Sequence, residues 1–221
     1  MILRRLAIFL LAAPLALSAQ VKPGALDQAL RDLDAGSAKF KTTEADFQKD
    51  FYERVVKETT TQNGSIYYRK NGNKLEMGAK INPPSARYIS YKDGKLGVFD
   101  PGSKDLKLYD TGKNKAQAES FLTLGFGGSG TELARAWTIT DLGTEQMSDG
   151  SASVPVTKLD LVSKDPNVRN MFSHITIWVD LNRAISLKQR FFTPSGDYQT
   201  ATYTNIRYNQ NVNTAPYQYK K

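Results

Sequence analysis

The side chain best suited to catalysis is that of His174, the only histidine among the 221 residues. A Ser-His-Asp or Cys-His mechanism would have to act through it, because such reactions need an imidazole to move the proton. Strand-like alternation in the segment HITIWVD places His174 beside Thr176 on the polar side of an expected strand. Such a residue is expected to face solvent, so the sequence predicts that the protein is not an enzyme.

Other residues that carry chemistry are absent or scattered. The chain has no cysteine, so with one histidine the usual zinc ligands are missing. Carboxylates lack the paired pattern of a glycosidase. The run GFGGSG, residues 125–130, lacks the Gly-Lys-Ser/Thr ending of a phosphate loop and does not follow a strand. We interpret it as a flexible hinge between two short helices, and expect no metal and no other cofactor.

Large apolar side chains are better candidates for a binding function. The chain has 11 Tyr, 10 Phe and 2 Trp, most of which must be core residues, as aromatic residues in strands usually are. A subset could line a cavity instead, with residues near 121–126 as its lid. The candidates for the cavity or lid are Phe47, Phe51, Tyr68, Met77, Phe99, Phe121, Leu122, Leu124, Phe126, Ile175, Ile177 and Phe191.

Strands must position most of these residues. Runs of alternating apolar and polar residues are separated by turn signals, among them Asn63-Gly64, Asn71-Gly72-Asn73, Asp93-Gly94 and Pro194-Ser195-Gly196. The segments from residue 40 to residue 60 are expected to form two strands or one long bent strand. The count predicts about 10–11 antiparallel strands in a mostly β fold.

About three short helices accompany the strands. Residues 24–36 carry apolar side chains at spacings of three and four, and Gly36 is expected to end that helix. Two further helices are expected over 116–124 and 131–136, the latter capped by Ser129 or Thr131. A helical turn is expected after Asp165.

The strand alternation indicates one apolar face and one mostly solvated face. Three short helices cannot cover so long an apolar face, so the sheet must curl over itself. At about 25 cal/mol per Å² of apolar surface, leaving the face bare would be costly. Either side chains fill the interior, or a ligand does.

The N-terminal segment MILRRLAIFLLAAPLALSAQ is typical of a secretory signal peptide, with two arginines before an apolar run. Cleavage is expected near Ser18 or Ala19, so residues 1–19 form the leader and residues 20–221 a single domain. Without a cysteine the mature chain has no acceptor for a lipid anchor, and we expect a periplasmic protein. The formal charge is +8, and the basic residues are scattered singly or in pairs rather than gathered into a stripe, which argues against nucleic acid as a partner.

The order of these segments resembles the LolA family of periplasmic lipoprotein carriers. The matching stretches are the first helix with FKTTEADFQ, GSIYYRKNGNKLEMG, YISYKDGKLGVFDPGSKDLKLYD, and residues 175–209. The resemblance implies a single highly curved antiparallel sheet, an open half-barrel lidded by helices around a hydrophobic cavity. The related LolB receptors carry a lipidated cysteine, which is absent here.

The resemblance also implies a function and partners. Such a carrier is a monomeric chaperone that holds the acyl chains of lipid-modified proteins. It takes them from an inner-membrane lipoprotein-releasing ABC transporter complex to an outer-membrane receptor. A basic residue near the lid helps transfer in the family, and Arg69 or Lys70 takes that place here, although the neighbouring proline and tryptophan are missing. The alternative is a periplasmic carrier or sensor of another lipid or hydrophobic small molecule with the same fold.

Overall fold

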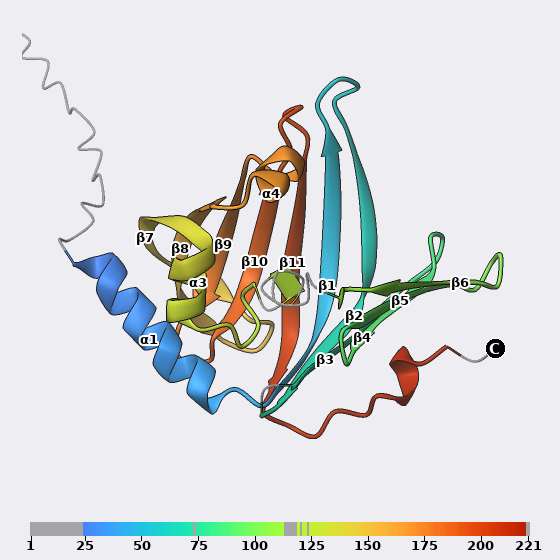
Figure 1. Cartoon of the computed structure of the whole chain (residues 1–221), viewed down its shortest axis with the longest axis horizontal. Coiled ribbons are helices and arrows are strands. Elements are labelled where there is room, and N and C mark those ends of the chain that lie inside the picture. The colour runs from blue at the N-terminus through green and yellow to red at the C-terminus, as the bar shows by residue number, and fades with distance from the viewer. Residues whose placement is uncertain (1–23, 73, 113–118, 120, 123, 220–221) are drawn as a thin grey trace, which may run out of the picture.

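The computed structural model describes residues 24–72, 74–112, 119, 121–122 and 124–219, so the expected leader lies outside the described residues. The described strands form one open antiparallel sheet of eleven strands, in the order β6-β5-β4-β3-β2-β1-β11-β10-β9-β8-β7 (Figure 1). The pairing of β1 with β11 joins the two halves of the chain in the middle of this sheet. The prediction of a mostly β, single antiparallel sheet with 10–11 strands is confirmed.

The strands fall into two groups along the chain. The first six are β1 (Thr42–Glu53), β2 (Glu58–Asn71), β3 (Lys74–Ile81), β4 (Arg87–Lys92), β5 (Lys95–Asp100) and β6 (Asp105–Asp110). The remaining five are β7 (Trp137–Ser148), β8 (Ser153–Ser163), β9 (His174–Asp180), β10 (Ile185–Phe192) and β11 (Tyr198–Tyr208). Within each group, consecutive strands pair as a meander.

Three α-helices in the described part of the chain accompany the sheet: α1 (Ala25–Lys39), α3 (Gly130–Ala136) and α4 (Pro166–Met171). Helix α3 begins with a capping box, in which Ser129 and Glu132 each accept from the other's backbone N–H, as predicted for Ser129. Helix α4 is the expected turn after Asp165, whose side chain caps it. The helix expected over 116–124 lies partly outside the described residues, with Glu119, Phe121 and Leu122 helical.

Two glycines were misinterpreted from the sequence. Helix α1 continues past Gly36 to Lys39, and Gly64 lies within β2 rather than in a turn. At both positions the absence of a side chain lets another segment of the chain pack against the glycine backbone. A Cβ at Gly36 would lie 2.2 Å from the Leu181 carbonyl oxygen, and one at Gly64 would lie 2.7 Å from the Phe47 ring. Gly64 therefore provides the surface on which Phe47 rests.

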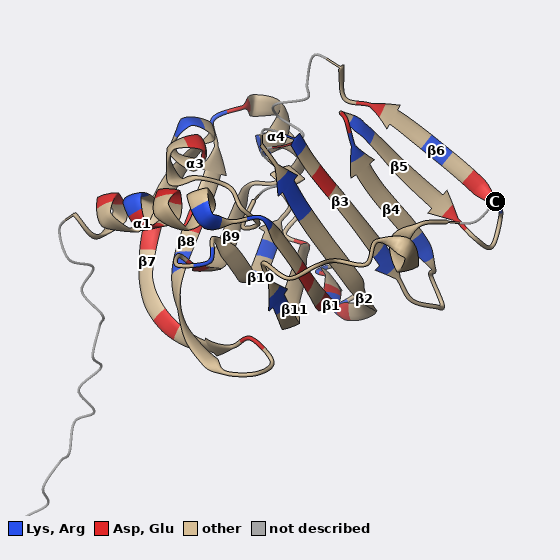
Figure 2. Cartoon of the chain, turned by 90° about the horizontal axis from the view of Figure 1, so that it is seen from below, with Lys and Arg blue, Asp and Glu red and all other residues tan. Residues whose placement is uncertain are grey.

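The prediction that Thr176, Trp178 and Asp180 of β9 lie on a solvated face is wrong, because each of them is only 5% exposed. The β7–β8 hairpin curls across this side of the sheet (Figure 2). Its turn reaches β11, which is three strands away from β8, because the Ile206 N–H donates to the Asp149 carbonyl. Strong curvature therefore buries both faces of the sheet at this end.

Candidate functional site

The site is built on the face of the sheet that the helices cover. Directly opposed residues of antiparallel strands point to the same side. Two such rows cross the middle of the sheet: Ile175–Phe191–Gln199–Phe51, and Ile177–Gln189–Ala201–Lys49. The Gln189 side-chain amide donates to the Leu124 carbonyl, so the segment around Leu124 lies on this side. We call it the helix face.

The β7–β10 end of the helix face is filled by the protein itself. Ile175 and Ile177 are 0% and 1% exposed, and Leu33 of α1 and Leu133 of α3 belong to the same apolar cluster. Figure 1 shows α1 and α3 lying over these strands. Three more of the predicted cavity residues, Phe121, Leu124 and Phe191, contact this cluster or belong to it. This end is a packed core.

The middle of the helix face is closed by an aromatic stack. The Phe126 ring lies parallel to that of Tyr68, with centroids 4.3 Å apart, and edge-on to Tyr203 at 4.9 Å. Met77 belongs to the same cluster, and Leu122 packs against it. Burial and a hydrogen bond to Glu119, with an O–O distance of 2.9 Å, raise the pKa of Tyr91 to about 12. The structure thus brings the predicted lid residues onto the predicted sheet residues.

The glycine-rich segment is anchored, where the sequence predicted a flexible hinge. The Gly127 N–H donates to the Ala184 carbonyl at 2.8 Å, and the Ser37 hydroxyl donates to the Gly127 carbonyl at 2.7 Å. A Cβ at Gly127 would lie 2.4 Å from the Phe40 ring. These glycines let the segment pack closely against β10 and α1.

The β1–β2 end of the helix face is only partly covered. Phe47, Lys49 and Phe51 alternate along β1, share this face, and are all half-buried. The Lys49 ammonium lies 4.7 Å from the centroid of the Phe51 ring. Burial lowers the pKa of Lys49, and no described carboxylate forms an ion pair with it. The sequence analysis missed Lys49, although its alternation with Phe47 and Phe51 was a usable signal.

The two candidate basic residues point to opposite sides. The Arg69 guanidinium forms an ion pair with Glu76 at 2.8 Å, and register places both residues on the side away from the helices. Lys70 is opposite Leu75 and shares the helix face. Of the two, only Lys70 therefore shares the helix face.

One predicted cavity residue lies elsewhere. Phe99 is on the face away from the helices, where it stacks on Tyr219 with ring centroids 4.7 Å apart. The neighbouring Tyr217 is 3% exposed, and its hydroxyl donates to Glu44 at 2.6 Å. The C-terminal segment thus covers Phe99, which is not part of the helix face.

The part of the chain that the structure describes shows neither a cluster of metal ligands nor a membrane-spanning helix. No group of three or more potential metal ligands occurs there. No helix there has both the length and the apolar character needed to cross a membrane.

The fold is similar to that of several solved structures, although the sequence matches no family model and no curated protein. MucB matches with a TM-score of 0.55 and 12% identity, over 88% of this chain and 62% of that chain. An uncharacterized conserved protein from Thermus thermophilus matches with a TM-score of 0.54 and 11% identity, over 88% and 94%. The LolA superfamily protein NE2245 from Nitrosomonas europaea matches with a TM-score of 0.42 and 12% identity, over 88% and 97%.

These matches concern the fold. Identities of 11–13% are too low to carry a function from one chain to another. This chain spans about 60% of the length of the MucB chains that it matches. A second MucB structure, from Pseudomonas aeruginosa, is described as a complex with MucA.

Proposed function

We propose that this protein is a periplasmic carrier that binds the acyl chain of a lipid or of a lipid-modified protein on the helix face. One observation supports this most directly: the apolar face continues beyond the lid segment as a partly buried strip that includes Phe47 and Phe51. Most proteins cover such a strip with their own side chains. The LolA-like sequence pattern and the open helix-covered sheet agree with this role.

The binding energy would come from many weak apolar contacts. Each buried CH₂ contributes roughly 0.8 kcal/mol, so an acyl chain can displace a lid side chain and still bind favourably. Entry begins at the strip that includes Phe47 and Phe51. Deeper penetration requires Phe126 to leave the space between Tyr68 and Tyr203, which it fills in this structure. Release then needs only a receptor that offers the chain a better apolar site.

Uptake of an environment-sensitive fluorescent fatty acid tests the proposal. We expect saturable binding, and at least a tenfold weaker affinity for Phe51→Asp, because the substitution places a charge on the binding strip. Leu108→Asp is the matched control, since Leu108 is 67% exposed on edge strand β6. Absence of uptake by the wild-type protein, or equal losses in both variants, would contradict the proposal.

The cargo and the membrane partners are part of the same proposal. Export by the expected signal peptide would place the chain where lipoproteins leave an inner-membrane releasing complex and reach an outer-membrane receptor. Native mass spectrometry of protein isolated from the periplasm separates two cargoes. A bound acylated protein supports lipoprotein transport, and a bound free lipid supports the alternative carrier or sensor.

Lys49 is expected to favour cargo with an anionic group. Its ammonium lies among apolar side chains without a described carboxylate partner, so a bound anion would supply the missing charge. The wild type should bind a fatty acid several-fold more tightly than the fatty alcohol of equal length, and Lys49→Met should lose that preference. Lys107→Met, on edge strand β6, is the control. An unchanged preference in Lys49→Met would refute the assignment.

The same substitution is expected to stabilise the empty protein. Because the folded-state pKa of Lys49 is lowered, the charged form costs stability below that pKa, and the cost disappears as the pH rises toward the ordinary value of 10.5. Lys49→Met should raise the free energy of unfolding at neutral pH by about 0.5–1 kcal/mol. Urea denaturation at several pH values should show this gain shrinking under alkaline conditions. A gain that does not depend on pH would contradict this cause.

A further inference from the structure

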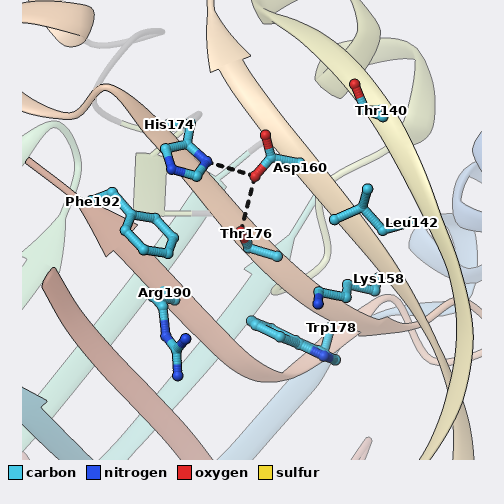
Figure 3. Close-up of a pocket in the computed structure, with 9 residues that line it drawn as sticks. All are labelled: Thr140, Leu142, Lys158, Asp160, His174, Thr176, Trp178, Arg190 and Phe192. Atoms are coloured by element: carbon cyan, nitrogen blue, oxygen red, sulfur yellow. Dashed lines mark hydrogen bonds and ion pairs between the residues drawn. The ribbon is translucent and has the colours of Figure 1, made fainter.

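An open cavity lies on the side of the sheet away from the helix face. Figure 3 shows its lining, which comes from four neighbouring strands, β7 to β10. It has a volume of about 320 Å³ and is lined by Thr140, Leu142, Lys158, Asp160, His174, Thr176, Trp178, Arg190 and Phe192. The curled β7–β8 hairpin forms one wall, with Leu142 47% exposed.

The strand register arranges basic and aromatic side chains in adjacent rows. Trp178 of β9 is opposite Lys158 of β8 and Lys188 of β10. Both ammonium groups lie over the indole, 5.1 and 4.6 Å from the ring centroid. The next row holds Thr176 and Arg190, and the row after that His174 and Phe192. The lining thus combines cations with flat apolar surfaces.

These cations are not neutralised by the neighbouring carboxylate. Asp160 accepts from the Thr176 hydroxyl at 2.9 Å and lies 2.7 Å from Nδ1 of His174. Among the described residues, no ion pair involves Lys158, Lys188 or Arg190. Burial, and then the charges of Arg190 and Lys158, lower the pKa of Lys188, against the opposite effect of Glu145. An anion in the cavity would relieve this repulsion.

Flat surfaces border the cationic groups. The His174 and Phe192 rings are stacked, with centroids 4.1 Å apart and an interplanar angle of 8°. The Arg190 guanidinium is fixed by donation from Nε to the Thr200 hydroxyl at 2.9 Å, which leaves its terminal nitrogens for a ligand. Trp178 is only 5% exposed, with Lys158 and Lys188 over its ring, so Phe192 and Leu142 are the apolar surfaces that remain for a ligand.

We propose that this cavity binds a small organic anion in which a carboxylate or phosphate is attached to a planar ring. The anionic group contacts Arg190 and Lys158, and the ring packs against Phe192 and Leu142. The volume is at the low end for small-molecule sites, and the cationic lining does not suit acyl chains. The site is separate from the helix face and does not depend on the proposed carrier function.

Isothermal titration of the purified chain with phenyl phosphate tests this site, with benzoate as the carboxylate counterpart. We expect saturable one-to-one binding of phenyl phosphate, and at least tenfold weaker binding of both benzyl alcohol, which lacks the charge, and inorganic phosphate, which lacks the ring. Arg190→Gln and Lys158→Gln should each weaken phenyl phosphate binding at least tenfold. Lys107→Gln, which removes the same charge from β6, should leave it unchanged.

Several results would overturn the proposal. They are no saturable binding of phenyl phosphate or benzoate, equally tight binding of benzyl alcohol or of inorganic phosphate, or equal affinity in Arg190→Gln and Lys107→Gln. Thermal unfolding followed by circular dichroism verifies that each variant is folded. Fatty-acid uptake is expected to be unchanged in Arg190→Gln, which separates this site from the helix face.

Discussion

Replacing Phe126 by alanine is expected to lower the free energy of unfolding by about 3–5 kcal/mol, the usual range for a buried phenylalanine. The Phe126 side chain is 1% exposed and fills the space between Tyr68 and Tyr203. Its backbone also bridges to Ile185 at the start of β10, so the surroundings cannot collapse easily onto the void. Urea denaturation with an unchanged m-value measures the loss.

Leu108→Ala is the control for Phe126→Ala, because Leu108 is 67% exposed and its truncation should change stability by less than about 0.5 kcal/mol. A loss below about 1 kcal/mol in Phe126→Ala would contradict the described packing. The carrier proposal adds a second expectation. An apolar void tends to accept apolar ligands, so Phe126→Ala should bind the fluorescent fatty acid at least as tightly as the wild type.

Replacing Gly127 by alanine is expected to be comparably harmful. Gly127 has a φ of 73°, a conformation that costs other residues about 1–2 kcal/mol. The added Cβ would also lie 2.4 Å from the Phe40 ring, and such overpacking typically costs a further ~1–3 kcal/mol. Together these effects should lower the free energy of unfolding by roughly 2–5 kcal/mol, as measured by urea denaturation.

Gly143 provides the matched control, since it has a φ of 93° and no atom within 4 Å of its added Cβ. Gly143→Ala should therefore show the backbone cost alone. The difference between the two variants measures how tightly the glycine-rich segment is anchored against α1 and β10. Equal losses of unfolding free energy in the two variants would mean that the glycine-rich segment moves aside easily, as a flexible hinge would.

The two proposed binding surfaces make different demands on the fold. The helix face needs apolar surface that the protein leaves half-covered, as at Phe47 and Phe51. The cavity on the other side holds the cations of Lys158 and Arg190, for which no ion pair occurs among the described residues.

The sequence by itself determined the strands and most of the turns between them, and its resemblance to the LolA family implied the single-sheet architecture. Alternation along the strands and turn signals such as Asp93-Gly94 are local properties, and Ser129 indicated the start of α3 through its capping chemistry alone. The resemblance to LolA carriers rested on the order of the same segments. Local patterns also predicted Tyr68 in a strand and Phe126 in a segment over the sheet, and the structure stacks the two rings.

Tertiary structure decided what the local patterns could not express. Gly36 was predicted to end a helix and Gly64 to form a turn. Each is instead a glycine because another part of the protein packs against it, the Leu181 carbonyl at Gly36 and the Phe47 ring at Gly64. The sequence next to each glycine does not reveal these contacts. Trp178 and Asp180 were predicted to face solvent, but both are buried. The β7–β8 hairpin curls over this side of the sheet, and the alternation within β9 cannot reveal that curvature. The row that sets Lys158, Trp178 and Lys188 side by side exists only once the register of three strands is fixed. Contacts between distant segments have no signature in a local pattern, and both proposed sites are made of such contacts.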